Sequence, residues 1–500
     1  MPKLDTGQIR NVAFAGHNGA GKTSLVDALF FASGGSNRQG KVDDQTSVSD
    51  YEPEEHRRGS SIQLAVLPCY WKEHKINLLD TPGYPDFRGD MLSAVRVADT
   101  VILVISAAAG IEVGLQQAWK YMEDLGIPVI VVVNKLDREN TSFAQTCSEI
   151  AEAWGRNCVP VQTVDGDAES FSGVISSLGS DGLDETLLET IVEADDDLMM
   201  KYLEGETLSQ DEITAGLKAG VLSRLIVPIF AASASENIGT SELLDGILDL
   251  LPSPDEVEKP EIPENLQANL VFKTSADPFV GKLSYLRVYG ETLKSNSQLW
   301  NIQRGESERV GQVYQPVGKE TEGVDEVVRG DIGVISRLSY TQTFDTLGDK
   351  STEIKLGKAD LPTPVFALAI TPNAQADLDK MVESLTRMTE EDPTLEVERN
   401  ADTSETVLHG LGDIHVSLAI ERIARKFEVN LETALPSIAY RETVGGQTSV
   451  SYKHKKQSGG RGQYGRRRRR VDLRRANHGG RQGRRHGVRP RRHIVHGHDP

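Results

Sequence analysis

Short apolar runs, separated by longer amphipathic stretches, dominate the first half of the chain. The runs at residues 11–15, 76–80, 101–105, 129–133 and 227–232 are each nearly continuous in apolar residues. Such runs are typical of strands that are buried on both faces, and the sequence between them is long enough for crossover helices. The pattern predicts an α/β fold, in which helices cover both faces of a mostly parallel sheet.

Weaker signals fill the rest of this half. Residues 24–31 have the composition of an opening helix, and residues 62–66 have that of a further strand. Between 157 and 225 the apolar runs are short, and 185–204 is an acidic, helix-like stretch. We interpret 157–225 as an insertion in the sheet domain.

The second half has a different pattern. Apolar residues alternate between 275 and 289 and lead to Gly290, which predicts hairpin strands. A run at 364–370 then begins a β-α-β-β-α order, because two later segments carry apolar residues at helical spacing. These residues are Leu378, Met381, Val382, Leu385 and Met388 in the first helix, and Val416, Ile420, Ile423 and Phe427 in the second.

Length and charge refine this picture. The chain has 500 residues, which is too long for one core and suggests three or four domains. Its formal charge is −19, but residues 466–500 hold 13 of the 55 Lys and Arg residues and only two acids, Asp472 and Asp499. The remainder therefore has 42 basic and 72 acidic residues, a charge of −30. Such an acidic body is unlike a general nucleic-acid binder, so RNA contacts would depend on local basic patches, and we expect no DNA partner.

Cysteines and apolar lengths exclude other classes. Cys69, Cys147 and Cys158 are odd in number and form no C-x-x-C pair, which argues against a disulfide framework or a zinc site. The longest apolar runs are far too short to span a bilayer, and the first ten residues are mixed and polar. We expect a cytoplasmic protein without a membrane partner.

A glycine-rich loop between the first strand and the first helix carries the clearest chemistry. Residues 16–24 read G-H-N-G-A-G-K-T-S, which fits the phosphate-binding pattern. In such loops backbone N–H groups surround the α- and β-phosphates, the lysine approaches the β- and γ-phosphates, and the threonine hydroxyl binds Mg²⁺. A chance glycine-rich turn is the alternative. The predicted nucleotide contacts are Gly16, His17, Asn18, Gly19, Ala20, Gly21, Lys22, Thr23 and Ser24.

A second acidic motif follows the strand at 76–80. This strand ends in Asp80, and Thr81, Pro82 and Gly83 come next. We expect Asp80 to hold magnesium through water and the Gly83 N–H to meet a γ-phosphate. The polar segment 33–49 and its continuation to residue 62 would be a mobile loop that is released when this phosphate is lost.

Two further motifs predict guanine. The strand at 129–133 runs into Asn134, Lys135 and Asp137, where the Asp137 carboxylate can accept two hydrogen bonds from guanine that adenine cannot supply. Asn134 would brace the loop and Lys135 would lie along the base. After the strand at 227–232, a backbone N–H of the Ser233-Ala234 turn could face the guanine O6. A solvated turn is an alternative for the Asn-Lys-x-Asp motif alone, but the four motifs in this order predict a GTP site.

These motifs together resemble the elongation factor G family, and more narrowly its second-copy, G-like branch. The likeness includes R-R-G-S-S-I, L-D-T-P-G-Y-P-D-F and L-L-P-S-P and continues beyond the sheet domain. The resemblance implies the following division of the chain. It gives a P-loop GTPase domain at 1–260 with the insertion at 157–225, a β-barrel domain at 261–355, a ferredoxin-like α+β domain at 362–437, and the start of a fourth domain at 438–465.

Three positions depart from the family pattern. Tyr84 stands where the family usually has the histidine that orients the attacking water, and phenols, with an ordinary pKa of about 10, are poor proton acceptors at neutral pH. Ser61 replaces the usual threonine but keeps the hydroxyl that would bind Mg²⁺. Gly19 replaces a common aspartate. The resemblance thus implies Tyr84, Lys22 and Gly83 as catalytic residues, and Thr23, Ser61 and Asp80 as metal ligands.

The likeness stops after Gly465. An arginine-rich tail follows at 466–500, which is either an arm for ribosomal RNA or the product of a shifted reading frame after a truncated fourth domain. In both cases we expect no fold there. His409 and His415 could suggest a metal site, but no acid or cysteine stands at ligand spacing, so we expect structural histidines.

The resemblance implies a monomeric, ribosome-associated GTPase that uses GTP/GDP and Mg²⁺ and is slow without the ribosome. The alternatives are a GTP-binding protein that docks on ribosomes without translocation activity, and a ribosome recycling or protection factor.

Overall fold

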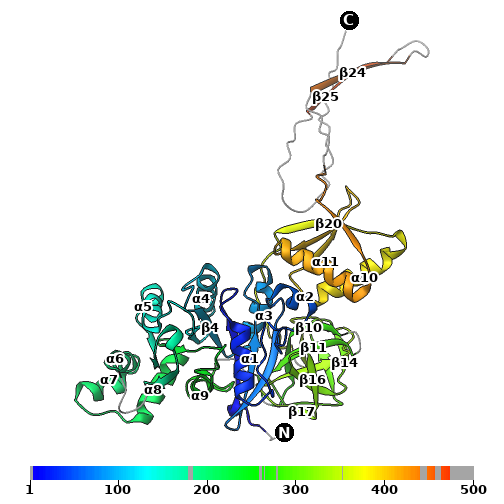
Figure 1. Cartoon of the computed structure of the whole chain (residues 1–500). Helices are drawn as coiled ribbons and strands as arrows, with labels where there is room; N and C mark the ends of the chain where they lie inside the picture. Colours follow the sequence, from blue (N-terminus) through cyan, green and yellow to red (C-terminus); the bar gives the residue numbers. More distant parts are fainter. Residues whose placement is uncertain are drawn as a thin grey trace. The chain divides into compact units, whose positions relative to one another are not determined.

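The structure is a computed structural model, and it describes residues 4–177, 184–257, 262–263, 265–277, 280–351, 353–439, 447–456 and 463–472 (Figure 1). The chain divides into two compact units, Met1–Pro436 and Ser437–Pro500, and each is described by itself.

A seven-stranded sheet forms the centre of the first domain. Its strand order is β2-β3-β1-β4-β5-β9-β6, and every neighbouring pair is parallel except β2 with β3. The predicted mostly parallel sheet is therefore confirmed. The strands are β1 (Ile9–Ala15), β2 (Ala65–Trp71), β3 (His74–Asp80), β4 (Thr100–Ser106), β5 (Val129–Asn134), β6 (Cys158–Pro160) and β9 (Val227–Ala231).

Strand β2 begins three residues later than the sequence predicts. The backbone N–H groups of Ile62 and Gln63 donate to the Glu55 carboxylate, at 2.9 and 3.3 Å, instead of to a neighbouring strand. The predicted strand at 62–66 is wrong at its start because this side chain takes the donors that a ladder would need.

Helices cover both faces of the sheet, as the continuous apolar strands predict. One buried cluster joins Val12 and Phe14 of β1 to α1 and α9, and the other joins Ala13 and Ala15 to α3, α4 and α5. The bounds are α1 (Lys22–Ala32), α3 (Arg88–Val97), α4 (Val113–Leu125), α5 (Phe143–Trp154) and α9 (Thr240–Leu250).

The segment at 157–225 contributes β6 to the sheet edge and then forms a small hairpin and helices. The predicted acidic helix at 185–204 is two helices, because the Asp195 carboxylate accepts from the N–H groups of Asp197 and Leu198 and so begins a new helix. Leu187, Ile191 and Leu217 join the buried cluster beneath α1. The elements are β7 (Gln162–Asp165), β8 (Gly173–Ser176), α6 (Glu185–Glu193), α7 (Asp196–Leu203) and α8 (Gln210–Leu222).

An antiparallel β domain follows. Its main sheet has the order β14-β13-β19-β10-β11-β18-β15-β16 around a core that includes Val271, Leu286 and Ile335. Its strands are β10 (Ala268–Asp277), β11 (Gly281–Val288), β12 (Leu293–Lys294), β13 (Gln298–Asn301), β14 (Glu306–Arg309), β15 (Val313–Val317), β16 (Glu320–Val324), β17 (Glu326–Val327), β18 (Ile332–Ser336) and β19 (Thr346–Gly348).

The next domain packs two helices on a four-stranded antiparallel sheet of order β21-β22-β20-β23. Met381, Leu385 and Met388 of the first helix are buried, whereas Leu378 and Val382 are 39 and 55% exposed and lie at the edge of the predicted apolar stripe. The elements are β20 (Phe366–Pro372), α10 (Leu378–Glu391), β21 (Glu396–Arg399), β22 (Thr406–Gly410), α11 (Asp413–Phe427) and β23 (Leu431–Ala434).

In the second unit, β24 (Gln447–Lys456) pairs antiparallel with β25 (Gln463–Asp472). Residues 466–472 therefore do not lack a fold, contrary to the expectation for the tail. A two-stranded ladder is held by backbone hydrogen bonds, which do not require apolar side chains. Residues 473–500 lie outside the described residues.

No helix in the described part of the chain combines the length and the apolar character needed to cross a bilayer.

Candidate functional site

The glycine-rich loop connects β1 to α1 at the carboxyl end of the sheet. Gly16, Gly19 and Gly21 have φ values of +149, +81 and +89°. A Cβ atom on Gly16 would lie 2.5 Å from the Val104 carbonyl oxygen, so the loop requires glycine there for space as well as for φ. Helix α1 begins at Lys22, so its first N–H groups face the loop, which is the arrangement that favours anions.

Lys22 is buried across the loop. Its Nζ donates to the carbonyl oxygens of Gly16 and His17 at 3.2 and 3.0 Å. A Cβ on Gly83 would clash with this Nζ, so the structure brings Gly83 against Lys22 as the sequence predicts. Burial lowers the pKa of Lys22 to about 8, although Asp80 and Asp50 oppose the shift. An anion beside Nζ would raise this pKa again and favour the charged form of Lys22.

Two hydroxyl groups and two carboxylates gather beside Lys22. Thr23 Oγ1 and Ser61 Oγ lie 2.8 Å apart. Asp80 and Asp50 are buried, and none of their carboxylate oxygens has a hydrogen-bond partner within the described residues. Burial, followed by the charge of Asp50, raises the pKa of Asp80 to about 8.

Buried carboxylates without partners are costly, and a hard cation that binds oxygen would satisfy them. The described residues contain no group of three or more His, Cys, Asp or Glu side chains that could hold a metal ion alone. The remaining oxygen ligands would therefore have to come from the Thr23 and Ser61 hydroxyls and from ligand phosphates. With these oxygens added, the residues present fit Mg²⁺.

Sequence reasoning missed Asp50 and Asp27. Asp27 lies one turn after Thr23 in α1, is buried, and accepts from the Val48 N–H at 3.0 Å. It thereby fixes the chain that leads to Asp50, within a segment expected to be a mobile loop. Asp27 stands four residues after Thr23, which places both on one face of α1, and this spacing is the one signal in the sequence that could have identified Asp27. The polar sequence around Asp50 contains no such signal.

The segment before Ser61 is ordered by helix α2 (Pro53–Arg58). Glu55 of this helix is buried and also accepts from the N–H groups of Tyr51 and Glu52, both at 3.0 Å. Burial and the nearby Asp50 raise the pKa of Glu55 to about 7.

The two loops predicted to bind guanine meet the glycine-rich loop. Asn134 Nδ2 donates to the carbonyl oxygens of Ala20 and Gly21 at 3.2 and 3.3 Å, and Asn134 Oδ1 accepts from the Ala234 N–H at 3.0 Å. Lys135 Nζ donates to the Gly19 carbonyl oxygen at 2.7 Å. The Ala234 N–H, which the sequence predicts to be available to guanine O6, thus donates to Asn134 in this structure.

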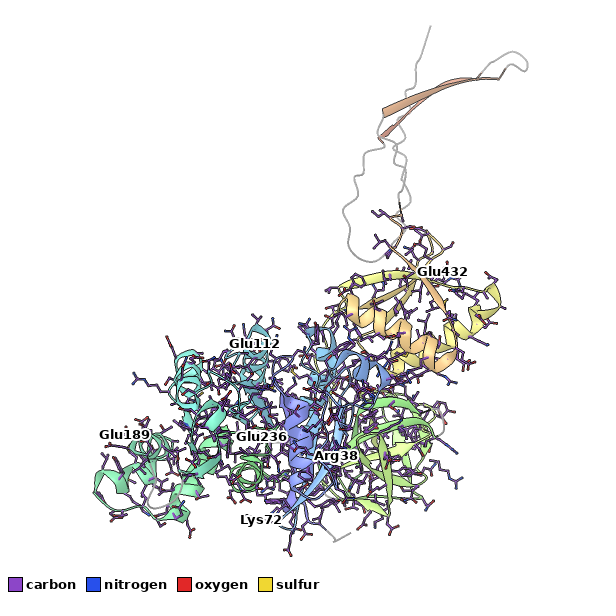
Figure 2. All side chains as sticks on the ribbon, in the orientation of Figure 1. Arg38, Lys72, Glu112, Glu189, Glu236 and Glu432 are labelled. Atoms are coloured by element: carbon purple, nitrogen blue, oxygen red, sulfur yellow. The ribbon has the colours of Figure 1, made fainter. Side chains whose placement is uncertain are left out.

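Asp137 completes this end of the site. Its carboxylate accepts from the hydroxyls of Ser233 and Ser235 at 2.7 and 3.1 Å. At the other end of the glycine-rich loop, the His17 imidazole lies 3.4 Å from the carboxylate of Glu112, which is labelled in Figure 2. The residues predicted to contact the nucleotide thus lie together at one edge of the sheet. Asn18 lies in the glycine-rich loop, and Ser24 lies in the first turn of α1.

Tyr84 follows Gly83 but is half-buried in an apolar cluster. It packs against a cluster formed by Ile62, Phe87 and Leu418, the last of which belongs to α11. The tyrosine on which hydrolysis is predicted to depend therefore packs on a cluster to which another domain contributes Leu418.

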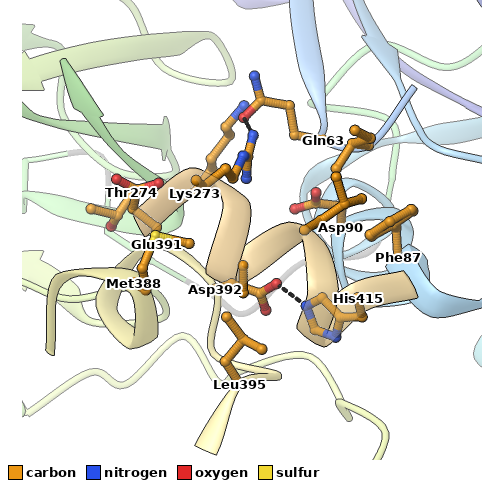
Figure 3. A pocket seen from close by; sticks show the side chains of 14 residues that line it. Gln63, Phe87, Asp90, Lys273, Thr274, Met388, Glu391, Asp392, Leu395 and His415 are labelled. Atoms are coloured by element: carbon orange, nitrogen blue, oxygen red, sulfur yellow. Dashed lines mark hydrogen bonds and ion pairs between the residues drawn. The ribbon is translucent and has the colours of Figure 1, made fainter. Parts of the chain in front are cut away.

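Figure 3 shows where three domains meet beside this cluster. Gln63, Phe87 and Asp90 face Lys273 and Thr274 of the β domain and residues of α10 and α11. His415 Nε2 lies 2.7 Å from Asp392 Oδ2, while its Nδ1 accepts from the Leu411 N–H at 3.0 Å. The His415 imidazole is thus held by hydrogen bonds within its own domain.

Comparisons with known proteins agree along most of the chain. Residues 7–253 match the elongation factor Tu GTP binding domain, 267–350 match elongation factor G domain 2, and 361–435 match elongation factor G domain III. The chain is also similar to ttk003000868 from Thermus thermophilus, a protein of known crystal structure, with a TM-score of 0.82 and 31% identity over 93% of this chain and 73% of that one. The chain belongs to the elongation factor G family of translational GTPases.

Proposed function

We propose that the chain binds GTP with Mg²⁺, hydrolyses it to GDP and phosphate, and acts on the ribosome. The observation that carries this proposal is the Asn134 side chain, which joins the glycine-rich loop to the Ser233-Ala234 turn and so combines a phosphate site with a guanine site. Membership of a translational GTPase family supports the ribosome as partner and the cytoplasm as location.

The glycine-rich loop would hold the phosphates. Its backbone N–H groups and the start of α1 would surround the α- and β-phosphates, and the β- and γ-phosphates would favour the charged form of Lys22. Thr23 and Ser61 would bind Mg²⁺ directly, and Asp80 with Asp50 would do so through water. Bound Mg²⁺ would neutralise phosphate charge.

Guanine recognition would rest on Asp137. Its carboxylate would accept from N1–H and the 2-amino group while Ser233 and Ser235 hold it in place. Adenine offers no matching pair of donors, so it could not make these two hydrogen bonds to Asp137.

Hydrolysis would depend on Gly83, Lys22 and Tyr84. Lys22 and the Gly83 N–H would stabilise charge on the γ-phosphate, and the Tyr84 hydroxyl would hold the attacking water. The contact of Tyr84 with the Ile62, Phe87 and Leu418 cluster supports slow hydrolysis until the ribosome moves the tyrosine. We assign domains at 1–260, 261–355 and 362–437, with 438–465 as the start of a fourth.

Single-turnover GTP cleavage with and without ribosomes tests this proposal. We expect slow cleavage alone and at least tenfold faster cleavage with ribosomes, and Asp80→Asn should weaken GTP binding in Mg²⁺ far more than in EDTA. Fast cleavage without ribosomes would contradict the role of Tyr84, whereas absent GTP binding would contradict the whole site.

The same packing of Tyr84 favours a second candidate function, that of a GTP-binding protein that docks on ribosomes without translocating them. A translocation assay separates the two, because movement at rates typical of the family would eliminate the second candidate.

A further inference from the structure

A cavity of about 310 Å³ lies on the first domain, away from the nucleotide site. It is lined by Val129 and Val227, the first residues of β5 and β9. Asn134 and the Ser233 turn lie at the opposite ends of the same strands. The volume falls within the range of small-molecule pockets, which begins at about 300 Å³.

Two tryptophans form one wall of the cavity. Trp119 of α4 and Trp154, the last residue of α5, stack with ring centroids 4.4 Å apart and an interplanar angle of 1°. Both tryptophans also pack against the core, which explains why they stack on each other. Core packing does not explain the cavity beside them. Neither indole N–H has a hydrogen-bond partner among the residues that the structure describes. The other apolar lining residues are Met122, Ile127 and Ile226.

Arg224 lies at the rim in a strained conformation. It follows α8 with φ +66°, a position at which helices commonly end in glycine. A side chain with a Cβ atom is strained in this region, which glycine enters freely. A Cβ on Gly126, at the end of α4, would clash with Arg224 Nη1, so this glycine leaves room for the guanidinium.

The Arg224 guanidinium has no ion pair or hydrogen bond with any described residue. The negative end of the α4 dipole attracts the guanidinium, but this attraction does not occupy the N–H groups, which can still donate hydrogen bonds to a ligand. Glu123, an exposed acid, also lines the cavity, together with Asn157 and Ser223. The site therefore offers aromatic faces, one unpaired cation and one acid.

We propose that this cavity binds a small planar aromatic molecule that carries one carboxylate. The ring would contact the indoles of Trp119 and Trp154, and the carboxylate would accept two hydrogen bonds from Arg224. Glu123 would repel a second carboxylate. The site is separate from the nucleotide and does not rest on the function proposed above.

Naphthalene-2-carboxylate is a suitable probe, with 2-naphthylmethylammonium as its cationic counterpart. Titration calorimetry and saturation-transfer NMR on the full chain, with saturating GDP and Mg²⁺ present, would measure both. We expect the carboxylate to bind at least tenfold more tightly than the ammonium. Equal binding of the two, or binding of the carboxylate only when GDP is left out, would overturn the proposal.

Arg224→Gly separates binding from folding. Glycine is the preferred residue at this φ, so the melting temperature should stay the same or rise while affinity for the carboxylate falls at least tenfold. Trp154→Leu should weaken both probes, because both use the aromatic wall. Arg387→Gln, which removes an exposed arginine from α10, should change neither affinity. Unchanged binding in Arg224→Gly would refute the assignment.

Discussion

At the scale of single residues, the nucleotide site is built from charges that the protein alone does not satisfy. Burial holds the pKa of Lys22 at about 8 and that of Asp80 at about 8, so each is pushed toward its neutral form. Ligand phosphates and a cation would bring the missing charges. Without a ligand, the raised pKa of Asp80 should make the folded chain more stable as pH falls below about 8, whereas the lowered pKa of Lys22 acts in the opposite sense above that pH.

Asp27 gives a direct test of this pH effect. Burial raises its pKa to about 6, so the unfolded chain loses this proton at a lower pH than the folded chain does. The Asp27 contribution to stability is therefore lost as pH rises from about 4 to 6. Asp27→Asn keeps an oxygen for the Val48 N–H but removes the charge.

We expect the melting temperature of Asp27→Asn without nucleotide to exceed that of the wild type at pH 7.5 by about 2–4 °C, the shift that 1 kcal/mol produces in a domain of this size. Below pH 4 the difference should vanish. Scanning fluorimetry from about pH 3 to 8 checks it, with the exposed Asp124→Asn as control. A constant difference across this range would contradict the assignment.

Asp137→Asn tests the choice of base. The substitution replaces a charged acceptor by an amide, and hydrogen bonds to charged groups contribute about 1.5–3 kcal/mol each. Loss of two such bonds should weaken GTP binding by about 10²- to 10⁴-fold. Xanthosine triphosphate, which has a carbonyl oxygen in place of the 2-amino group, should bind the variant better than the wild type. Competition against a fluorescent GDP analogue measures both, and unchanged GTP affinity would remove Asp137 from the site.

At the scale of elements, α11 touches both segments that would respond to the γ-phosphate. Arg425 binds Glu54 of α2 at 2.7 Å and also pairs with Glu52, and Arg57 pairs with Glu421. On the other side, Asp86 accepts from the His415 N–H at 3.3 Å near the start of α11. A movement of either α2 or the segment around Asp86 would therefore change the contacts of α11.

Arg425→Gln should release α2 from α11. Arg425 is partly exposed but Glu54 is buried, so the loss of stability should exceed the roughly 0–1 kcal/mol of a surface pair, and local opening needs no more than that. Hydrogen exchange at residues 52–58 should quicken several-fold, and raising salt from 50 to 500 mM should have the same effect on the wild type. Arg387→Gln, which breaks a pair inside α10, is the control. Equal exchange in both variants would exclude the link.

The elements also show what the sequence could and could not predict. Strands β3, β4 and β5 were predictable because strands buried on both faces are continuous in apolar residues. The start of β2 was not, since Glu55 takes the N–H groups of Ile62 and Gln63. The residues predicted to bind phosphate and guanine follow local motifs, whereas Asp50 lies at the site because Asp27 of α1 holds the Val48 N–H, a contact between segments that a local pattern cannot indicate.

At the scale of the whole first unit, buried ion pairs connect the GTPase domain to the β domain. Arg287 lies 2.5 Å from Asp99, and Lys75 lies 2.8 Å from Asp331, with all four side chains buried. Removing one partner of such a pair leaves a buried charge, which costs about 3–5 kcal/mol.

Arg287→Met should therefore destabilise the chain by about 3–5 kcal/mol in urea unfolding. The double variant Arg287→Met with Asp99→Asn should recover part of this loss, because the remaining group is then neutral. If the double variant were as unstable as the single one, lost packing rather than the unpaired charge would explain the effect.

The Asn134 side chain has a consequence for kinetics. Since one amide holds the Ala20 and Gly21 carbonyl oxygens and the Ala234 N–H together, the two ends of the nucleotide pocket share a support. The effects of substitutions at Asp137 and at Lys22 on nucleotide affinity should therefore be non-additive. A substitution at either end should accelerate release of the whole nucleotide. Breaking the hydrogen bonds of this one side chain would then be enough to let GDP leave and GTP enter, while the strands of the sheet stay paired.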